Sequence, residues 1–245
     1  MRPFVISTDT TADLPAEYTK EHGISIHPLH YLIDEKEYGM ELGELTPHEF
    51  YQTMRDGKMP TTNATNLGYD IKLMEELAEQ GNDILHISFS SQMSTSYNNA
   101  RLAAEEVMGR HPECRIVVFD SKNATCGLSV LIRMLVKMKE NGSTLDEAAA
   151  WVEEVLPHTV CNFTLPDLFH MWRGGRLKKS SAVLGTALKI QPVLHINDEG
   201  ALEPVKKVRG RSAAVKGLYA DLARLCEEGK RPEMVCITHG DCPEE

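Results

Sequence analysis

GNDILHISFSSQMSTSYNNARLAAEEV, residues 81–107, is the stretch that decides the predicted fold. It begins with an apolar run over residues 84–89, typical of a buried strand, and ends with apolar residues spaced three and four apart, typical of a helix. Between the two, residues 90–97 carry six hydroxyl groups. A strand that leads directly into a helix leaves the helix's first N–H groups unpaired at the carboxyl end of the sheet. Hydroxyls there cap the helix, bind an anion, or do both, and capping alone needs only one or two of them.

The first part of the chain repeats this strand–loop–helix order. Residues 4–7, 24–33 and 115–119 are further expected strands, and their alternation with helical segments is typical of a parallel α/β fold. Polar segments separate an expected strand from an expected helix at residues 8–13, 60–66, 90–96 and 120–123. Because the carboxyl ends of parallel strands share one edge of the sheet, we expect these four segments to converge there.

The pattern changes after Pro157. Expected strands over residues 190–196 and 201–208 flank a turn, which indicates antiparallel pairing. A helix over residues 182–189 and a strand over residues 234–239 are also expected. We therefore predict an N-terminal Rossmann-like α/β/α domain with a parallel sheet over residues 1–157. A C-terminal α/β domain with a largely antiparallel sheet is predicted over residues 158–245.

Composition narrows the classes of protein. The 245 residues, 42% of them hydrophobic, are enough to form a substantial core. A balance of 26 basic to 36 acidic residues, or −10, opposes binding to nucleic acid. No apolar run approaches ~18 residues, so no integral membrane segment is expected. Six cysteines without a CxxC pair and an N-terminus without a signal peptide pattern predict reduced thiols and a cytoplasmic location.

The polar segments are rich in neutral hydrogen-bond donors. Sequence patterns of a nucleotide-binding loop, a hydrolase nucleophile elbow or a zinc site do not occur. A cluster of hydroxyls without a nucleophile–base pair suits a carboxylate or phosphate that is held and not cleaved. The candidate donors are Thr61, Thr62, Ser91, Ser94 and Ser96. The candidate cations are Arg173, Arg176 and Arg209, for which surface charge or structural pairing is the alternative.

Two other functions fit the same residues. Asp9 and Asp120 follow expected strands, so a phosphotransferase or a metal-dependent hydrolase could use both carboxylates at the sheet edge. Caps and turns explain such aspartates equally well, and Asp13 is well placed as the N-cap of a helix opened by Pro15. A sensor of a polar small molecule is the third interpretation.

Six segments, in order along the chain, resemble motifs of the DegV family. The correspondences are TDTTADLP (8–15) with TDSTADLP, PTTN (60–63) with P-x-T-S, SSQMSTSY (90–97) with SSxLSGTY, DSK (120–122) with DSK, RGGR (173–176) with RGGR, and KVRG (207–210) with KVRG. Each motif is short, but together they span nearly the whole chain.

The resemblance implies a two-domain protein that holds one long-chain fatty acid, such as palmitate, stearate or oleate, in a tunnel between the domains. It implies that the protein is the non-catalytic binding subunit of a fatty acid kinase, whose partner subunit phosphorylates the carboxylate with ATP. No catalytic residue, metal or cofactor is then expected, and transient membrane contact is compatible with this role. By resemblance, Thr62 and Ser94 bind the carboxylate, and Arg173, Arg176 and Arg209 are supporting or docking residues.

Three features depart from the family pattern. Thr95 replaces the glycine of SSxLSGTY, so the backbone is strained if this position needs a positive φ. Asn63 replaces the usual serine. The family also continues beyond position 245, so the sequence is expected to be truncated.

Overall fold

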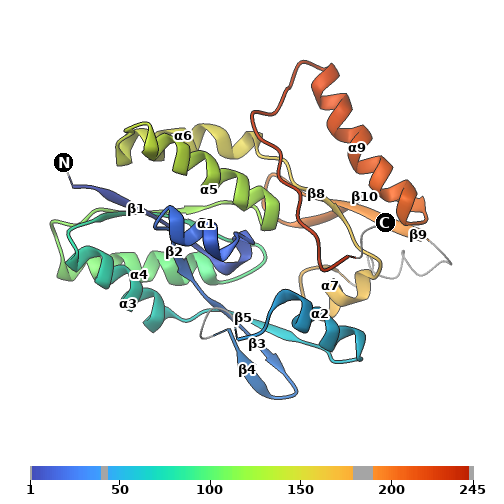
Figure 1. Ribbon diagram of the computed structural model, residues 1–245, viewed down its shortest axis with the longest axis horizontal. Coiled ribbons are helices and arrows are strands. Elements are labelled where there is room, and N and C mark those ends of the chain that lie inside the picture. Colours follow the sequence, from blue (N-terminus) through green and yellow to red (C-terminus); the bar gives the residue numbers. More distant parts are fainter. Residues whose placement is uncertain (1, 40–43, 179–189, 243–245) are drawn as a thin grey trace. The chain divides into compact units, whose positions relative to one another are not determined.

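The computed structural model describes residues 2–39, 44–178 and 190–242. Its contacts divide the chain into two compact units (Figure 1). The first comprises Met1–His158 together with Cys236–Glu245, and the second comprises Thr159–Val235. The domain limits expected from the sequence, at residue 157, stay a prediction.

A parallel four-stranded sheet forms the centre of the first unit, as the alternation predicts. Its strands are β1 (Phe4–Asp9), β2 (Ser25–His27), β6 (Asp83–Ser88) and β7 (Ile116–Asp120), in the order β2-β1-β6-β7. β1 pairs with β6 from Phe4 opposite Asp83, and β6 pairs with β7 from Ile84 opposite Ile116. These registers bring the carboxyl ends of β1, β6 and β7 to one edge.

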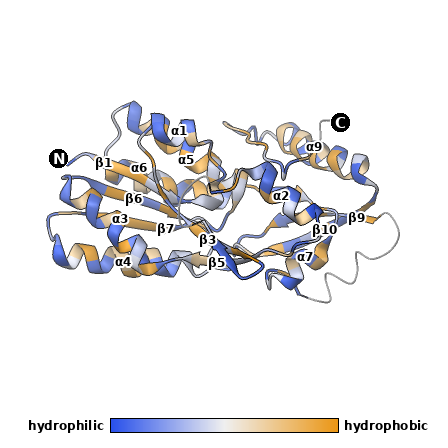
Figure 2. Cartoon of the chain, turned by 60° about the horizontal axis from the view of Figure 1, so that its bottom comes forward, coloured by the Kyte–Doolittle hydropathy of each residue, from blue (hydrophilic) through white to orange (hydrophobic). Residues whose placement is uncertain are grey.

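Helices cover both faces of this sheet (Figure 1). α5 (Thr125–Glu140) and α6 (Leu145–Val155) pack with Leu85 and Ile87 of β6. α3 (Leu67–Glu79) and α4 (Ser96–Arg110) pack on the other face with Ile84. Both faces of β6 are therefore buried, and the strands of this sheet contain hydrophobic stretches, which are orange in Figure 2.

The strand predicted over residues 24–33 is wrong in extent. Pro28 separates β2 from β3 (Leu29–Ile33), which belongs to another sheet, because proline cannot donate to a ladder hydrogen bond. β3 pairs antiparallel with β4 (Lys36–Tyr38) and with β5 (Thr61–Thr65). α2 (Pro47–Arg55) lies between β4 and β5 in the chain and starts with a capping box of Thr46 and Glu49.

The segment over residues 60–66 is also different from the prediction. Five of its residues form β5, so they are a strand of the small sheet and not a loop at the edge of the parallel sheet. A short 3-10 helix, η1 (Thr10–Ala12), follows β1, and α1 (Ala16–Glu21) follows η1. Asp13 is not the N-cap of α1: it ends η1 with φ 50°, and Pro15 occupies the cap position.

An antiparallel sheet forms the second unit, as predicted. β9 (Ile190–Ile196) pairs with β8 (Asn162–Thr164) and with β10 (Leu202–Arg209). This unit also contains α7 (Leu168–Arg173) and α9 (Arg211–Glu227), and the short η2 (Leu156–His158) precedes it. The helix expected over residues 182–189 lies outside the described residues. The strand expected over residues 234–239 is wrong, since that segment pairs with no sheet and Ile237 is 90% exposed.

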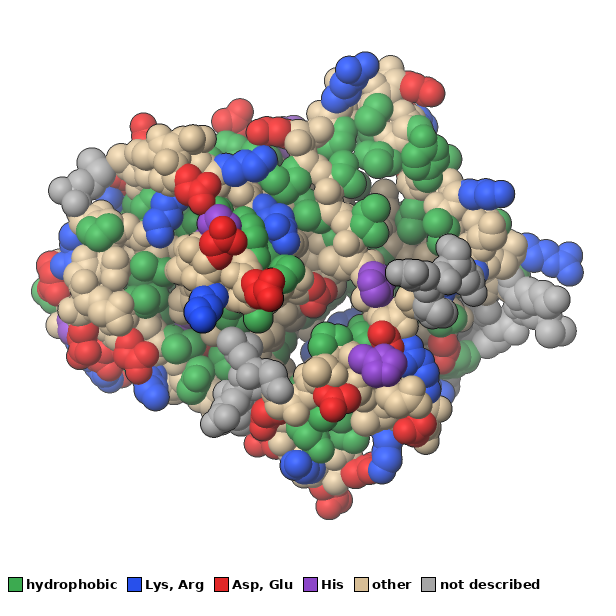
Figure 3. Space-filling model, in the orientation of Figure 1, with side chains coloured by type: hydrophobic (Ala, Val, Ile, Leu, Met, Phe, Trp, Pro, Cys, Tyr) green, Lys and Arg blue, Asp and Glu red, His purple; other side chains and the backbone are tan. Residues whose placement is uncertain are grey.

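The segment after Cys236 returns to the first unit and contacts α2. Asp241 Oδ2 lies 2.7 Å from an Arg55 guanidinium nitrogen and 3.0 Å from His48 Nδ1. Basic and acidic side chains are interspersed over the surface of this unit in Figure 3. In the described part of the chain, no helix combines the length and hydropathy that crossing a membrane requires.

Candidate functional site

Asp9 lies at the carboxyl end of β1 and joins two segments. Its Oδ1 accepts hydrogen bonds from the backbone N–H and the hydroxyl of Thr11. Asp9 is therefore the N-cap of η1. Its Oδ2 accepts from the backbone N–H of Phe89 at 2.7 Å and lies 3.4 Å from Ser88 Oγ. Burial raises the pKa of Asp9, and the bonds from Thr11 and Phe89 lower it in part. Both oxygens therefore have structural partners.

Asp120, at the end of β7, has a similar role on the neighbouring strand. Its Oδ1 accepts from the backbone N–H groups of Ser91, at 3.1 Å, and Lys122, at 2.9 Å. The backbone N–H of Ser90 donates to Asn123 O, so the loops after β6 and β7 are joined to each other. Within the described residues, no group of three or more His, Cys, Asp or Glu side chains is placed to hold a metal ion.

The start of α4 brings Ser94 and Ser96 together. Their hydroxyl oxygens are 2.8 Å apart, and the backbone N–H of Ser96 donates to Ser94 Oγ at 3.2 Å. Ser96 is 1% exposed, whereas Ser94 is half-buried and accessible from outside. Thr95 has φ −82°, an ordinary backbone conformation, so the expected strain from the missing glycine is absent.

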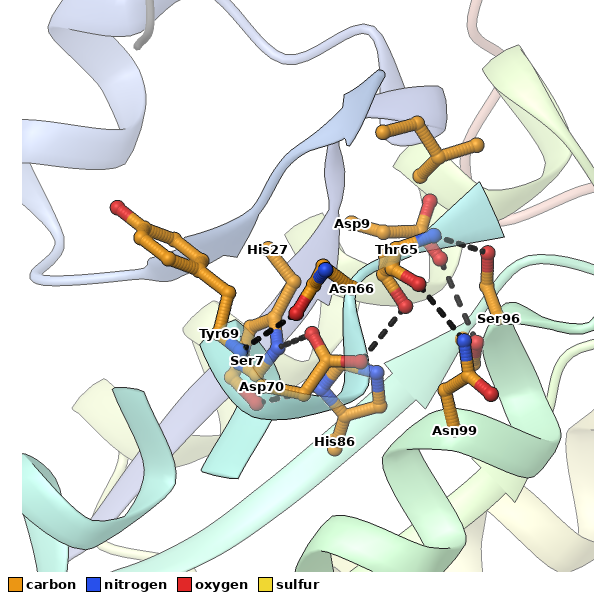
Figure 4. Close-up of polar contacts among 12 residues, drawn as sticks. Ser7, Asp9, His27, Thr65, Asn66, Tyr69, Asp70, His86, Ser96 and Asn99 are labelled. Atoms are coloured by element: carbon orange, nitrogen blue, oxygen red, sulfur yellow. Dashed lines mark hydrogen bonds and ion pairs between the residues drawn. The ribbon is translucent and has the colours of Figure 1, made fainter. Parts of the chain in front are cut away.

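A buried polar network continues from Ser96 into the unit (Figure 4). The backbone N–H of Thr65 donates to Ser96 Oγ at 3.2 Å, and Asn99 donates from its amide to Thr65 O at 2.7 Å. The Thr65 hydroxyl donates to Asp70 Oδ2 at 2.6 Å, and Asp70 Oδ1 lies 2.7 Å from His27 Nδ1. The network thus links the end of β5 to the start of α4.

Two buried histidines meet at the inner end of this network. The rings of His27 and His86 contact edge to face with centroids 4.7 Å apart, and His86 Nδ1 lies 2.7 Å from Ser7 Oγ. Burial, with a smaller effect of His27, lowers the pKa of His86 well below its usual value. His86 is therefore neutral at physiological pH.

Thr61 and Thr62 are consecutive exposed residues of β5, which places their side chains on opposite faces of the strand. Thr62 lies opposite Tyr31 of β3 and lines a pocket of about 310 Å³ with Thr10, Thr11 and Tyr31. His30, which is 6% exposed, also lines this pocket, and its Nε2 has no partner in the described structure.

The three predicted arginines belong to the second unit. Arg173 is 4.0 Å from Asp167 and lies over the ring of Phe169. Arg176 donates to Gly174 O, and Arg209 is an exposed residue of β10. Gly175, between the first two of these arginines, has a positive φ of 77°. In the first unit, the contact of β5 with α4 joins the segments that carry Thr61, Thr62, Ser94 and Ser96, and Ser91 is an exposed residue of the loop before α4.

Sequence reasoning missed the buried polar network. Its member His86 interrupts the apolar run of β6, Ser7 begins the polar half of β1, and Asp70 is a fully buried acid within an amphipathic helix. Polar residues at buried positions are the signal that could have indicated it, because such groups need hydrogen-bond partners.

Comparison with known proteins gives consistent results. A family model described as "Uncharacterised protein, DegV family" matches residues 3–245. A DegV domain-containing protein of Clostridium perfringens is 36% identical over 246 residues, which cover 100% of this chain and 84% of the relative.

Solved structures match the fold. A stearic acid-binding protein of Eubacterium ventriosum matches with a TM-score of 0.85 and 27% identity, over 93% of this chain and 78% of that one. The fatty acid kinase B3 protein of Streptococcus pneumoniae, loaded with linoleic acid, matches with a TM-score of 0.78 over 91% of this chain and 78% of that one. The second match, at 20% identity, concerns the fold alone.

Proposed function

Because the chain belongs to the DegV family, we propose that it binds one long-chain fatty acid, such as palmitate, stearate or oleate. The observation that carries this proposal is the pair Ser94–Ser96 at the start of α4, which presents a half-buried hydroxyl beside the strand of Thr61 and Thr62. The stearic acid-binding protein of 0.85 TM-score supports the ligand class.

Neutral donors suit a carboxylate that must be held without reaction. In our proposal, Thr62 and Ser94 hydrogen-bond the carboxylate, and Thr61, Ser91 and Ser96 complete the polar surroundings. A palmitate chain has about fourteen methylenes, and burial at ~0.8 kcal/mol each gives on the order of 10 kcal/mol before association costs are subtracted. The hydrocarbon then supplies most of the affinity, and the hydroxyls orient the carboxylate.

We further propose that the protein presents this carboxylate to a partner fatty acid kinase, which phosphorylates it with ATP, and that it performs no chemistry itself. The family resemblance supports this role. Arg173, Arg176 and Arg209 are proposed as supporting or docking residues, and the first and third are exposed. A cytoplasmic location with transient membrane contact completes the proposal.

The geometry disfavours the phosphotransferase or metal-dependent hydrolase. Asp9 already accepts hydrogen bonds at both oxygens, and Asp120 joins two loops through backbone N–H groups. The Asp9 carboxylate, with both oxygens occupied, is therefore poorly placed to bind a metal or take a proton, and a mechanism that needs both aspartates loses one of them.

Mass spectrometry of lipid extracted from the purified protein tests the ligand. We expect stoichiometric C16–C18 fatty acid. Folded protein that carries no lipid and takes up no added palmitate would contradict the proposal and return attention to the enzyme.

Substitution of the two hydroxyls tests the site. The double variant Thr62→Ala with Ser94→Ala should weaken palmitate binding by about a hundredfold or more, because it removes two hydrogen bonds to a charged group and each is worth about 1.5–3 kcal/mol. Unchanged affinity would show that the carboxylate lies elsewhere. Incubation of loaded protein with a fatty acid kinase and ATP tests presentation, and acyl phosphate should form only when both proteins are present.

A further inference from the structure

The hydroxyl protons of Ser94 and Ser96 have only one satisfactory arrangement. Ser96 Oγ accepts the backbone N–H of Thr65, and Ser94 Oγ accepts the backbone N–H of Ser96. One proton is shared along the 2.8 Å contact between the two oxygens, so either serine could donate it.

Consider first that Ser94 donates to Ser96. Ser96 Oγ then accepts two hydrogen bonds, and its own proton has no acceptor among the described residues although Ser96 is 1% exposed. A buried donor without a partner costs about 1–3 kcal/mol. In the opposite arrangement, Ser96 donates to Ser94, and each buried group of Ser96 has a partner. The second arrangement is therefore favoured.

This arrangement determines what Ser94 offers to a ligand. Its oxygen accepts from the backbone N–H and the hydroxyl of Ser96, so both lone pairs are occupied. Its own proton is left to donate outward from a half-buried position.

We infer that Ser94 is an obligate hydrogen-bond donor that selects an ionised carboxylate, and that Ser96, Thr65 and Asp70 are positioning residues that impose this direction. The inference rests on the proposed function and deepens it. A carboxylate has acceptors only, whereas a protonated acid must also place its own proton. The site therefore favours the charged head group over the neutral one.

The inner network keeps the direction constant. Thr65 donates its hydroxyl to Asp70, and Asn99 holds the Thr65 carbonyl, so the Thr65 N–H is fixed toward Ser96. Asp70 is 1% exposed and is anchored by His27, which is fully buried. Ser96 cannot turn to another acceptor without leaving one of these groups unpaired.

The test measures the pKa of the carboxyl group of bound palmitate labelled with ¹³C at C1, by NMR titration, together with the dissociation constants of palmitate and of hexadecanol. Ser96→Ala should raise the bound pKa by about one unit and weaken palmitate about tenfold, since one unit corresponds to a factor of ten. The hydroxyl of hexadecanol can accept or donate a hydrogen bond, so the dissociation constant of hexadecanol should change less than threefold.

Matched variants distinguish the effect of the hydrogen-bond direction at Ser94 from a general disruption of the fold around α4. Ser96→Thr keeps the hydroxyl and should retain the wild-type pKa. Thr95→Ala removes the neighbouring exposed hydroxyl, which makes no capping hydrogen bond, and should leave both constants within twofold. Asp70→Asn keeps the shape but not the charge that orients Thr65, and should raise the bound pKa by a smaller amount, so it serves if Ser96→Ala fails to fold.

The outcomes distinguish this inference from the function on which it rests. Palmitate bound by the wild type and weakened by Ser94→Ala, with an unchanged bound pKa in folded Ser96→Ala, would overturn the inference and leave the function intact. An equal effect of Thr95→Ala and Ser96→Ala would overturn it too. If Ser94→Ala does not change the dissociation constant of palmitate, the proposed carboxylate site itself is wrong.

Discussion

The carboxylate of Asp9 holds together the segments that follow β1 and β6. It accepts from Thr11 on one oxygen and from Phe89 on the other while fully buried. Asp9→Asn should lower the free energy of unfolding by about 2 kcal/mol, because the amide NH₂ must face one of these N–H donors and leave it unpaired. Urea unfolding measures the loss.

Asp34→Asn is the control for this change. Asp34 is exposed in the β3–β4 turn with φ 48°, a conformation that asparagine also adopts readily. Asp34→Asn removes only an exposed ion pair with Lys58, so we expect a much smaller loss than for Asp9→Asn. Equal stability of the two variants would show that the Asp9 bonds are not structural.

His86 makes the stability depend on pH. Burial lowers the pKa of His86 in the folded state. Below about pH 6.5, His86 therefore binds a proton in the unfolded chain but stays neutral in the folded chain. The contribution of His86 to the free energy of unfolding is therefore fully present above that pH. It decreases as the pH falls, by at most about 1.4 kcal/mol per pH unit. Urea unfolding between pH 5.5 and 7.5 should show this slope, and His86→Gln should reduce it. A slope unchanged in His86→Gln would assign it to other groups.

Among the elements, the turn between β3 and β4 has two consecutive strained residues and lies outside the proposed binding segments. Asp34 and Glu35 both have positive φ, 48° and 67°, in a hairpin turn that favours glycine. Glu35→Gly should raise the free energy of unfolding by about 0.5–1 kcal/mol, because relief of about 1–2 kcal/mol of strain exceeds the added chain entropy. Lys36→Gly, one residue further in β4, should destabilise instead. The two variants can be compared by thermal unfolding, and a loss in both would contradict the strain argument.

Apolar runs predicted the strands β1, β6 and β7 of the first unit, but local sequence did not predict β3, β4 and β5 as a separate sheet. Each of β1, β6 and β7 contains a short run of apolar residues, so its type was readable from local sequence. β5, with the sequence TTNAT, has no apolar pattern, and three of its five residues are exposed. Its pairing with β3 is what identifies it as a strand. The opposite error occurred over residues 234–239, where an apolar run has no neighbouring strand.

The candidate site was predictable in its outer residues and not in its inner ones. Hydroxyl-rich segments indicated Thr62, Ser94 and Ser96, because surplus donors are visible in the sequence. The support of Ser96 by Thr65 and Asp70 joins residues 31 and 5 positions apart and depends on how β5 meets α4. Local patterns carry no information on such contacts.

For the molecule as a whole, the two units differ in the size of their buried cores. The first has two extensive clusters around the parallel sheet, whereas the described cluster of the second centres on Leu168, Leu177 and Leu194. Native-state hydrogen exchange should therefore show earlier exchange in β8–β10 than in β1, β6 and β7. Identical protection of both sheets, after removal of bound lipid, would contradict separate opening of the units.

The return of the chain to α2 has a consequence for biosynthesis. Asp241 pairs with His48 and Arg55, which precede it by 193 and 186 residues, and the entire second unit is made in between. During translation, α2 must leave the ribosome long before its partner exists, so the early part of the nascent chain waits with an unfinished surface. The contact of Asp241 with α2 can form only after the second unit has emerged from the ribosome. The first unit is thus the first to be synthesised, but this contact within it forms after the second unit has been made.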